Sequence, residues 1–271
     1  MRVAVTLFLA SFVSAYAQTA PPQASGYNLV FSDEFDALNL SPTGTGSYTW
    51  YPGIWWEPSI PLPSLMTDSN STVNLTWSAT GGMNDTSIST LSRDATQGHT
   101  FRYGYFEARM RWDVATGAWP AFWMVPVQGA QGETHTGELD IFEGQGSQPL
   151  AYFGTLHEWN GTTEIWHSNP NMASRPSTND FAQWHTYGML WVPGKVTWYY
   201  DNVALFSSST TTIFDAQDFF LVLGMAEGAN WTKGDTTGVT ASNLNLYVDW
   251  VRVWQSGTAT ISSGNHGKKA K

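Results

Sequence analysis

Hydrophobic and polar positions alternate along much of this chain. The alternation is clear at 196–200, 219–225 and 246–254. Side chains of a strand point to opposite faces in turn, so each run predicts a strand with one buried face. Turn-forming pairs such as Pro193-Gly194 and Asp201-Asn202 separate the runs. Many short strands at this spacing predict an all-β sandwich or jelly roll with little helix.

One predicted strand carries three carboxylates within six residues, Glu138, Asp140 and Glu143. Glu138 and Asp140 are two positions apart and share a face of the strand. Glu143 lies at an odd offset from Glu138, which would turn it to the other face. A β-bulge at Ile141 or Phe142 would bring it back, and bulges are frequent beside active sites. The segment therefore predicts three acids on one surface.

Two carboxylates flanking a third suggest glycoside chemistry. Retaining hydrolysis needs a carboxylate nucleophile and a carboxylic acid about 5 to 5.5 Å apart. Asp140, placed between them, would keep Glu143 protonated by like-charge repulsion and could hydrogen-bond the nucleophile. The alternative is a solvated strand face whose acids only increase solubility.

The flanking sequence matches a family in several places. The matching segments, in order, are Val-Phe-Ser-Asp-Glu-Phe at 30–35, Tyr-Gly-Tyr-Phe-Glu-Ala-Arg at 103–109, Trp-Pro-Ala-Phe-Trp-Met at 119–124, the Glu-x-Asp-x-x-Glu acids, and Val-Asp-Trp-Val-Arg-Val at 248–253. Together they resemble glycoside hydrolase family 16, the laminarinase-like clan of retaining endo-glycanases on a concanavalin-like β-sandwich jelly roll. The spacing of the acids is similar to the bulged form found in laminarinases, agarases and carrageenases, and argues against lichenases and xyloglucan transglycosylases.

The resemblance implies roles for the three acids. Glu138 would be the nucleophile, Asp140 its assisting partner, and Glu143 the general acid and then base. No cofactor is required for this chemistry. The resemblance also implies a candidate structural calcium, with Glu34 and Asp249 near the two ends of the domain as ligands.

Four further residues are candidates for substrate binding by the same resemblance. Trp119 would border the sugar subsites, Trp123 would lie nearer the cleft floor, and His157 would reach the catalytic acids or the sugar. Trp231 follows a loop that departs from the usual laminarinase sequence, with Glu227 placed near the expected cleft. Sheet packing is the alternative role for the tryptophans. The departure leaves the substrate open.

Composition narrows the classes of partner. The chain has 15 Trp, 11 Tyr and 14 Phe, a surplus suited to stacking on sugar rings. The formal net charge of −10 argues against nucleic acid and against an anionic membrane surface. A neutral polysaccharide is the expected partner.

The expected organisation has four parts. Residues 1–17 resemble a secretory signal peptide, 18–26 form an N-terminal lead, 27–255 the catalytic domain, and 256–271 a polar tail predicted to be disordered. The apolar stretch is too short to span a membrane. The chain has no cysteine, so no disulfide supports it outside the cell. We expect a secreted, extracellular monomer.

Three functions remain open from the sequence. The first is an endo-glycoside hydrolase that cleaves β-1,3-linked glucan of the laminarin type by double displacement. The second applies the same mechanism to a β-galactan or agar-type chain. The third is a non-catalytic, lectin-like carbohydrate binder, since a fold alone does not license activity. The complete set of acids favours the enzymes over the binder.

Overall fold

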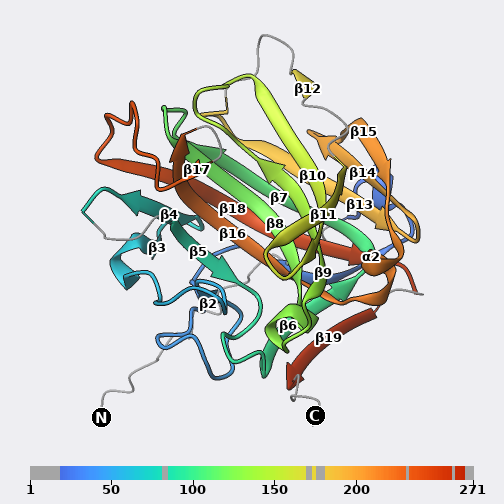
Figure 1. Cartoon of the computed structure of the whole chain (residues 1–271). Helices are drawn as coiled ribbons and strands as arrows, with labels where there is room; N and C mark the ends of the chain where they lie inside the picture. Colours follow the sequence, from blue (N-terminus) through green and yellow to red (C-terminus); the bar gives the residue numbers. More distant parts are fainter. Residues whose placement is uncertain are drawn as a thin grey trace, which may run out of the picture.

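The computed structural model describes residues 19–80, 85–168, 173–174, 181–229, 232–257 and 260–265. They form two antiparallel sheets packed face to face, with only short helices (Figure 1). The predicted all-β jelly-roll sandwich is confirmed. The signal segment 1–17 lies outside the described residues.

The first sheet has the strand order β15-β14-β13-β7-β18-β4-β3, with β1 paired to β18. Its strands are β1 (Asn28–Asp33), β3 (Met66–Asp68), β4 (Val73–Ser78), β7 (Gly104–Trp112), β13 (His185–Val192), β14 (Lys195–Tyr200), β15 (Val203–Ser209) and β18 (Asn243–Gln255).

The second sheet has the order β11-β10-β9-β8-β16-β5-β2, and β12, β17, β6 and β19 pair at its margins. Its strands are β2 (Tyr51–Pro52), β5 (Asp85–Ser89), β6 (Gln97–Arg102), β8 (Ala118–Pro126), β9 (His135–Glu143), β10 (Ala151–Asn160), β11 (Thr163–Ser168), β12 (Ala173–Ser174), β16 (Phe219–Ala229), β17 (Thr232–Lys233) and β19 (Thr260–Asn265). The helices are η1 (Pro22–Ala24), η2 (Pro63–Leu65), α1 (Val127–Ala130) and α2 (Thr212–Ala216).

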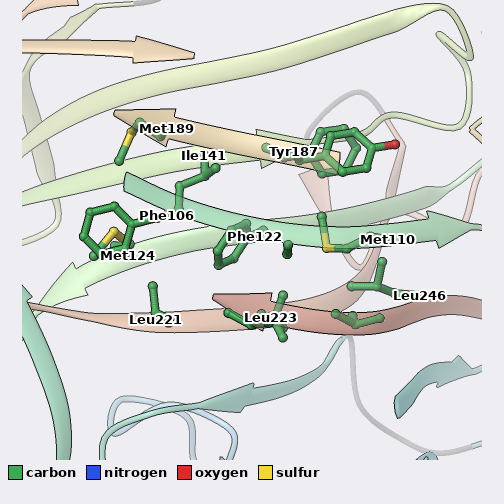
Figure 2. Close-up of a cluster of buried hydrophobic side chains, with 14 of the residues drawn as sticks. Phe106, Met110, Phe122, Met124, Ile141, Tyr187, Met189, Leu221, Leu223 and Leu246 are labelled. Atoms are coloured by element: carbon green, nitrogen blue, oxygen red, sulfur yellow. The ribbon is translucent and has the colours of Figure 1, made fainter. Parts of the chain in front are cut away.

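The core lies between the two sheets, where alternate residues of facing strands meet. Phe106 and Met110 of β7 come from the first sheet, and Phe122 of β8 and Leu223 of β16 from the second (Figure 2). All four side chains are fully buried. The hydrophobic residues whose alternation predicted the strands are therefore the residues that form the core. The other faces of β8 and β16 point away from the core.

Both flanks of the domain contact it, and the tail differs from the sequence prediction. In the lead, Gln23 Nε2 donates to the Tyr105 hydroxyl at 2.6 Å, and Ala24 packs on Tyr105 and Trp254. In the predicted disordered tail, Thr260–Asn265 instead form β19, antiparallel to β6. An edge strand exposes unpaired backbone groups, and these accept a partner whatever its side chains. A Gly- and Ser-rich segment can therefore pair although its composition suggests disorder.

Among the described residues, no helix has the length and apolar character needed to cross a membrane.

Truncating the core should test the packing directly. We expect Phe122→Ala to lower the free energy of unfolding by about 3–5 kcal/mol, because it opens a cavity between the sheets. Ile165→Ala, at a side chain 52% exposed, should change it by less than about 0.5 kcal/mol. Denaturant unfolding followed by tryptophan fluorescence measures both. Equal effects would contradict the placement of the core.

Candidate active site

Strand β9 contains the bulge that the spacing of the acids requires. On one side Phe142 pairs with Phe122, while Asp140 pairs with Trp123, so Ile141 is the extra residue. The register shifts at the same place against β10. The predicted bulge is thus confirmed. Ile141 and Phe142 are both buried in the core, which leaves the carboxylates on the other face.

Two side chains satisfy the carbonyl groups at the bulge. Trp198 Nε1, from the first sheet, donates to the Asp140 carbonyl at 2.8 Å. The Tyr152 hydroxyl, from β10, donates to the Ile141 carbonyl. A buried carbonyl without a partner costs free energy, so these donors stabilise the bulged backbone. Gly154 is required here, because a Cβ at that position would overlap the Trp198 ring.

The free face of the second sheet is hollowed in three adjoining places that share Glu138, and together we call them the cleft. The β5 hollow has a volume of about 250 Å³ and includes Trp56, Asp85, Ser87, Trp123 and Ala226. The α1 hollow, about 600 Å³, includes Trp55, Gly129, Thr136 and Trp159. The β11 hollow, about 600 Å³, includes Trp119, Thr155, His157, Glu164 and His167.

Strand register explains the floor of the β5 hollow. Glu143 pairs with Ala121, Ala121 with Gly224, and Gly224 with Ser87, so a row of small residues leads away from Glu143 across the sheet. Trp119 lies in the next row, beside Ala226. Small side chains on the floor and a tryptophan beside them produce a trench suited to a sugar chain.

Each outer carboxylate receives one indole N–H. Trp119 Nε1 donates to Glu143 Oε1 at 2.9 Å, and Trp159 Nε1 donates to Glu138 Oε2 at 2.9 Å. Trp119 therefore touches a catalytic candidate as well as bordering the cleft. Trp159 was missed by the sequence reasoning. Its position two residues after His157, on the same strand face, was the available signal.

His157 joins the acids from the neighbouring strand. It pairs with Glu138 across the β9–β10 ladder, and its Nε2 lies 3.1 Å from Asp140 Oδ2. Its Nδ1 contacts Glu164 Oε1 of β11. The Trp159 ring stacks on the imidazole at 5.5 Å between ring centroids. His157 thus lies where the resemblance implied, and it meets an acid, Glu164, that the sequence reasoning did not single out.

The electrostatics of the cluster follow from burial and crowding. Burial raises the pKa of Glu138 and of Glu143, and the charge of Asp140, which is only 3% exposed, raises both pKa values further. Burial lowers the pKa of His157, but the hydrogen bond and charge of Asp140, the charge of Glu138 and the bond to Glu164 outweigh it. The pKa of His157 is raised to about 10. The imidazole is therefore a cation at neutral pH.

The remaining substrate-binding candidates have different outcomes. Trp123 lines the β5 hollow, 6.0 Å from the Trp56 ring centroid. Trp231 lies outside the described residues. Glu227 does not face the cleft: it pairs with Ala118, whose side chain is in the core, and it is 1% exposed. Ala226 lines the cleft, so the next residue of the strand, Glu227, points to the opposite face, toward the core. Burial raises the pKa of Glu227.

The two calcium candidates form ion pairs. The Glu34 carboxylate accepts hydrogen bonds from Nε and Nη2 of Arg252, at 3.0 and 2.7 Å. Asp249 Oδ2 lies 2.5 Å from Arg109 Nη1. Each carboxylate is neutralised by an arginine rather than left for a cation. The calcium site stays a prediction that these contacts do not favour, and no step of the chemistry is assigned to it.

The charge on His157 can be measured without any substrate. Its two ring nitrogens should both carry protons at pH 8 in ¹⁵N spectra, because its pKa is raised to about 10 by its carboxylate neighbours. His157→Gln identifies the signals. A midpoint near the ordinary value of about 6.5 would contradict the contacts described.

Comparison with known proteins identifies the family. A family model described as "Glycosyl hydrolases family 16" matches residues 64–252, more than half of the chain. Endo-1,3-1,4-beta-glycanase EglC of Rhizobium meliloti (strain 1021) is 29% identical over 253 residues, covering 83% of this chain and 51% of the relative. Glucan endo-1,3-beta-glucosidase A1 of Niallia circulans is 25% identical over 269 residues, covering 86% of this chain and 39% of the relative. The chain thus spans about half or less of the length of these two relatives.

A solved structure supports the fold. The catalytic domain of an endo-1,3-beta-glucanase (laminarinase) from Thermotoga petrophila RKU-1 superposes with a TM-score of 0.68 at 21% identity, covering 86% of this chain and 99% of that domain. The sandwich, the bulged acids and the matched profile agree with the resemblance seen in the sequence. The chain belongs to glycoside hydrolase family 16.

Proposed function

We propose that this protein is a secreted retaining endo-glycoside hydrolase that cleaves β-1,3-linked glucan by double displacement. The observation that carries the proposal is the bulged strand β9, which brings Glu138, Asp140 and Glu143 to one cleft. The name of the Niallia relative, a glucan endo-1,3-beta-glucosidase, supports glucan as the substrate. The signal-like segment at 1–17 motivates secretion, and we propose that the enzyme acts as a monomer.

The surroundings of the two outer acids differ, and the difference suggests their roles. Glu138 pairs across the ladder with the His157 cation and accepts the Trp159 N–H, both of which favour its ionised form. Glu143 also accepts an indole N–H, from Trp119, and Asp140 raises the pKa of both acids, but the His157 charge is the first of the causes that lower the pKa of Glu138 and the last for Glu143. Glu138 is therefore the proposed nucleophile and Glu143 the proposed acid.

The reaction proceeds in two steps. Glu138 attacks the anomeric carbon while Glu143 gives its proton to the leaving glycosidic oxygen, which breaks the bond and forms a glycosyl-enzyme. Glu143, now ionised, takes a proton from water as that water attacks the same carbon. Glu138 leaves, and the product keeps the configuration of the substrate. Asp140 stays between the acids and orients them.

The charge of the cleft favours a neutral polymer. None of the described residues that line the three hollows is a lysine or an arginine. Glu133, Glu164 and Asp85 add further carboxylates to the catalytic ones. A sulfated or uronic chain would meet repulsion, whereas stacking on tryptophan and hydrogen bonding to carboxylates suit a neutral chain. The substrate class should be an uncharged β-glycan.

Sugar release from polysaccharides tests this function. The purified protein should release reducing ends from laminarin and fail on sulfated chains, and Glu138→Ala and Glu143→Ala should each lose at least about a hundredfold in rate while keeping the melting temperature. Barley mixed-linkage glucan, β-1,3-galactan and agarose complete the panel. Cutting of the galactans alone would contradict glucan as the substrate. Binding without release would make the protein a lectin-like binder.

A bulky side chain in the β5 hollow tests whether the substrate binds there. Ala226→Phe places a ring in the β5 hollow of about 250 Å³ and should lower kcat/KM on laminarin by at least about tenfold, mainly through KM. Ala204→Phe, at an exposed position of β15, is the matched control and should leave the kinetics unchanged. Unaltered kinetics in Ala226→Phe would remove this hollow from the substrate path.

A further inference from the structure

We propose that Glu164 is a positioning residue for the catalytic acids: it acts through His157, holding the imidazole as a cation against Asp140. The inference rests on the proposed function for its kinetic consequences. Its structural part concerns His157 alone. Glu164 belongs to β11, outside the Glu-x-Asp-x-x-Glu strand and outside the strand that carries the histidine.

The contacts at both ring nitrogens carry the argument. Nε2 of His157 lies 3.1 Å from Asp140 Oδ2, and Nδ1 contacts Glu164 Oε1. An ionised carboxylate only accepts hydrogen bonds. An imidazole with a carboxylate at each nitrogen therefore needs a proton on each, which makes it a cation. Without the Glu164 carboxylate, the Nδ1–H loses its ionised acceptor, and the ring is fixed against Asp140 through Nε2 alone.

The titratable groups around His157 come from two strands. Strand β9 contributes Glu138 and Asp140, with Glu143 farther along the same face. Strand β11 contributes Glu164 and His167, whose Nδ1 lies 3.5 Å from Glu164 Oε2. His157 and Glu164 are 23% and 33% exposed at the side chain, so water screens their contact only in part. Glu164 is thus the acid in this group that contacts His157 from outside strand β9.

The sign of the effect on pH dependence can be worked out. The bond to Glu164 raises the pKa of His157, and the charge of Glu164 raises the pKa of Glu138. Removing that charge lowers both pKa values. The acidic limb of the pH–rate profile, set by ionisation of the nucleophile, then moves to lower pH. The alkaline limb is set by the proton on Glu143, and Glu164 is not among the groups that shift the pKa of Glu143, so this limb keeps its place.

Glu164→Gln tests the proposal, since it keeps the size of the side chain and removes its charge. Strand β10 offers a matched control in Glu158, whose Oε1 lies 2.6 Å from His135 Nε2. We expect Glu164→Gln to lower the titration midpoint of His157 by at least about one pH unit in ¹⁵N spectra. On laminarin it should lower kcat roughly tenfold at the wild-type optimum, with little change in KM, and shift the acidic limb of the profile to lower pH. Glu158→Gln should do neither.

The outcomes separate this inference from the proposed function. A His157 midpoint that does not move would overturn the positioning role, and so would a loss of activity that is equal at every pH, because Glu164 would then contact the sugar directly. If the midpoint falls but neither wild type nor variant cuts any glycan, the contact stands and the proposed hydrolase fails. Glu164→Asp, which retains the charge on a shorter side chain, should restore most of the midpoint.

Discussion

The single extra residue in β9 is the constraint on which the site depends. With regular alternation, Glu143 would point into the core and Phe142 into the cleft. The bulge at Ile141 turns Phe142 to the core and Glu143 to the cleft. Ile141 and Phe142 are both fully buried in the core. Phe142 lies 4.2 Å from the Tyr187 ring of the opposite sheet, by centroids. Core packing and the orientation of the acids are therefore two consequences of one backbone irregularity.

The bulge also connects the site to the opposite sheet. Trp198 crosses the core to donate to the Asp140 carbonyl, and it can do so because Gly154 has no side chain. The middle acid is thus held through its backbone by one sheet and through its side chain by His157. A site that must keep several acids within a few ångströms of one another stores repulsion. Rigid support of this kind is how the fold resists that repulsion.

Parts of this arrangement could be predicted from the sequence, and the reasons are local. The odd offset from Glu138 to Glu143 requires a bulge on any strand, so the shared face could be predicted without a fold. Alternation likewise gave the strands and the core. Glu164 could not be assigned, because its contact with His157 depends on the register of β11 against β10, and the partner of Trp159 depends on the register of β10 against β9. Glu227 was placed on the wrong face for the same reason: one residue of register decides whether it meets the core or the cleft.

Contacts between strands that are far apart in the sequence were harder to predict. Strand β19 is held by backbone pairing to β6, a contact that leaves little trace in composition. The calcium that the family resemblance implied at Glu34 and Asp249 stays a prediction, and the arginines that pair with these carboxylates come from β7 and β18. In each case the missing information is which distant strand lies alongside. Patterns within one strand cannot supply it.

The most direct measurement of the central claim is covalent labelling of the nucleophile. A 2-deoxy-2-fluoro-β-laminaribioside with dinitrophenolate as the leaving group should attach one label per molecule, because the nucleophile displaces the phenolate and water releases the fluorinated glycosyl-enzyme slowly, and peptide mass spectrometry should place the label on Glu138. Label on Glu143, or on a residue outside the cleft, would contradict the assignment of roles by the bulge, His157 and Trp159.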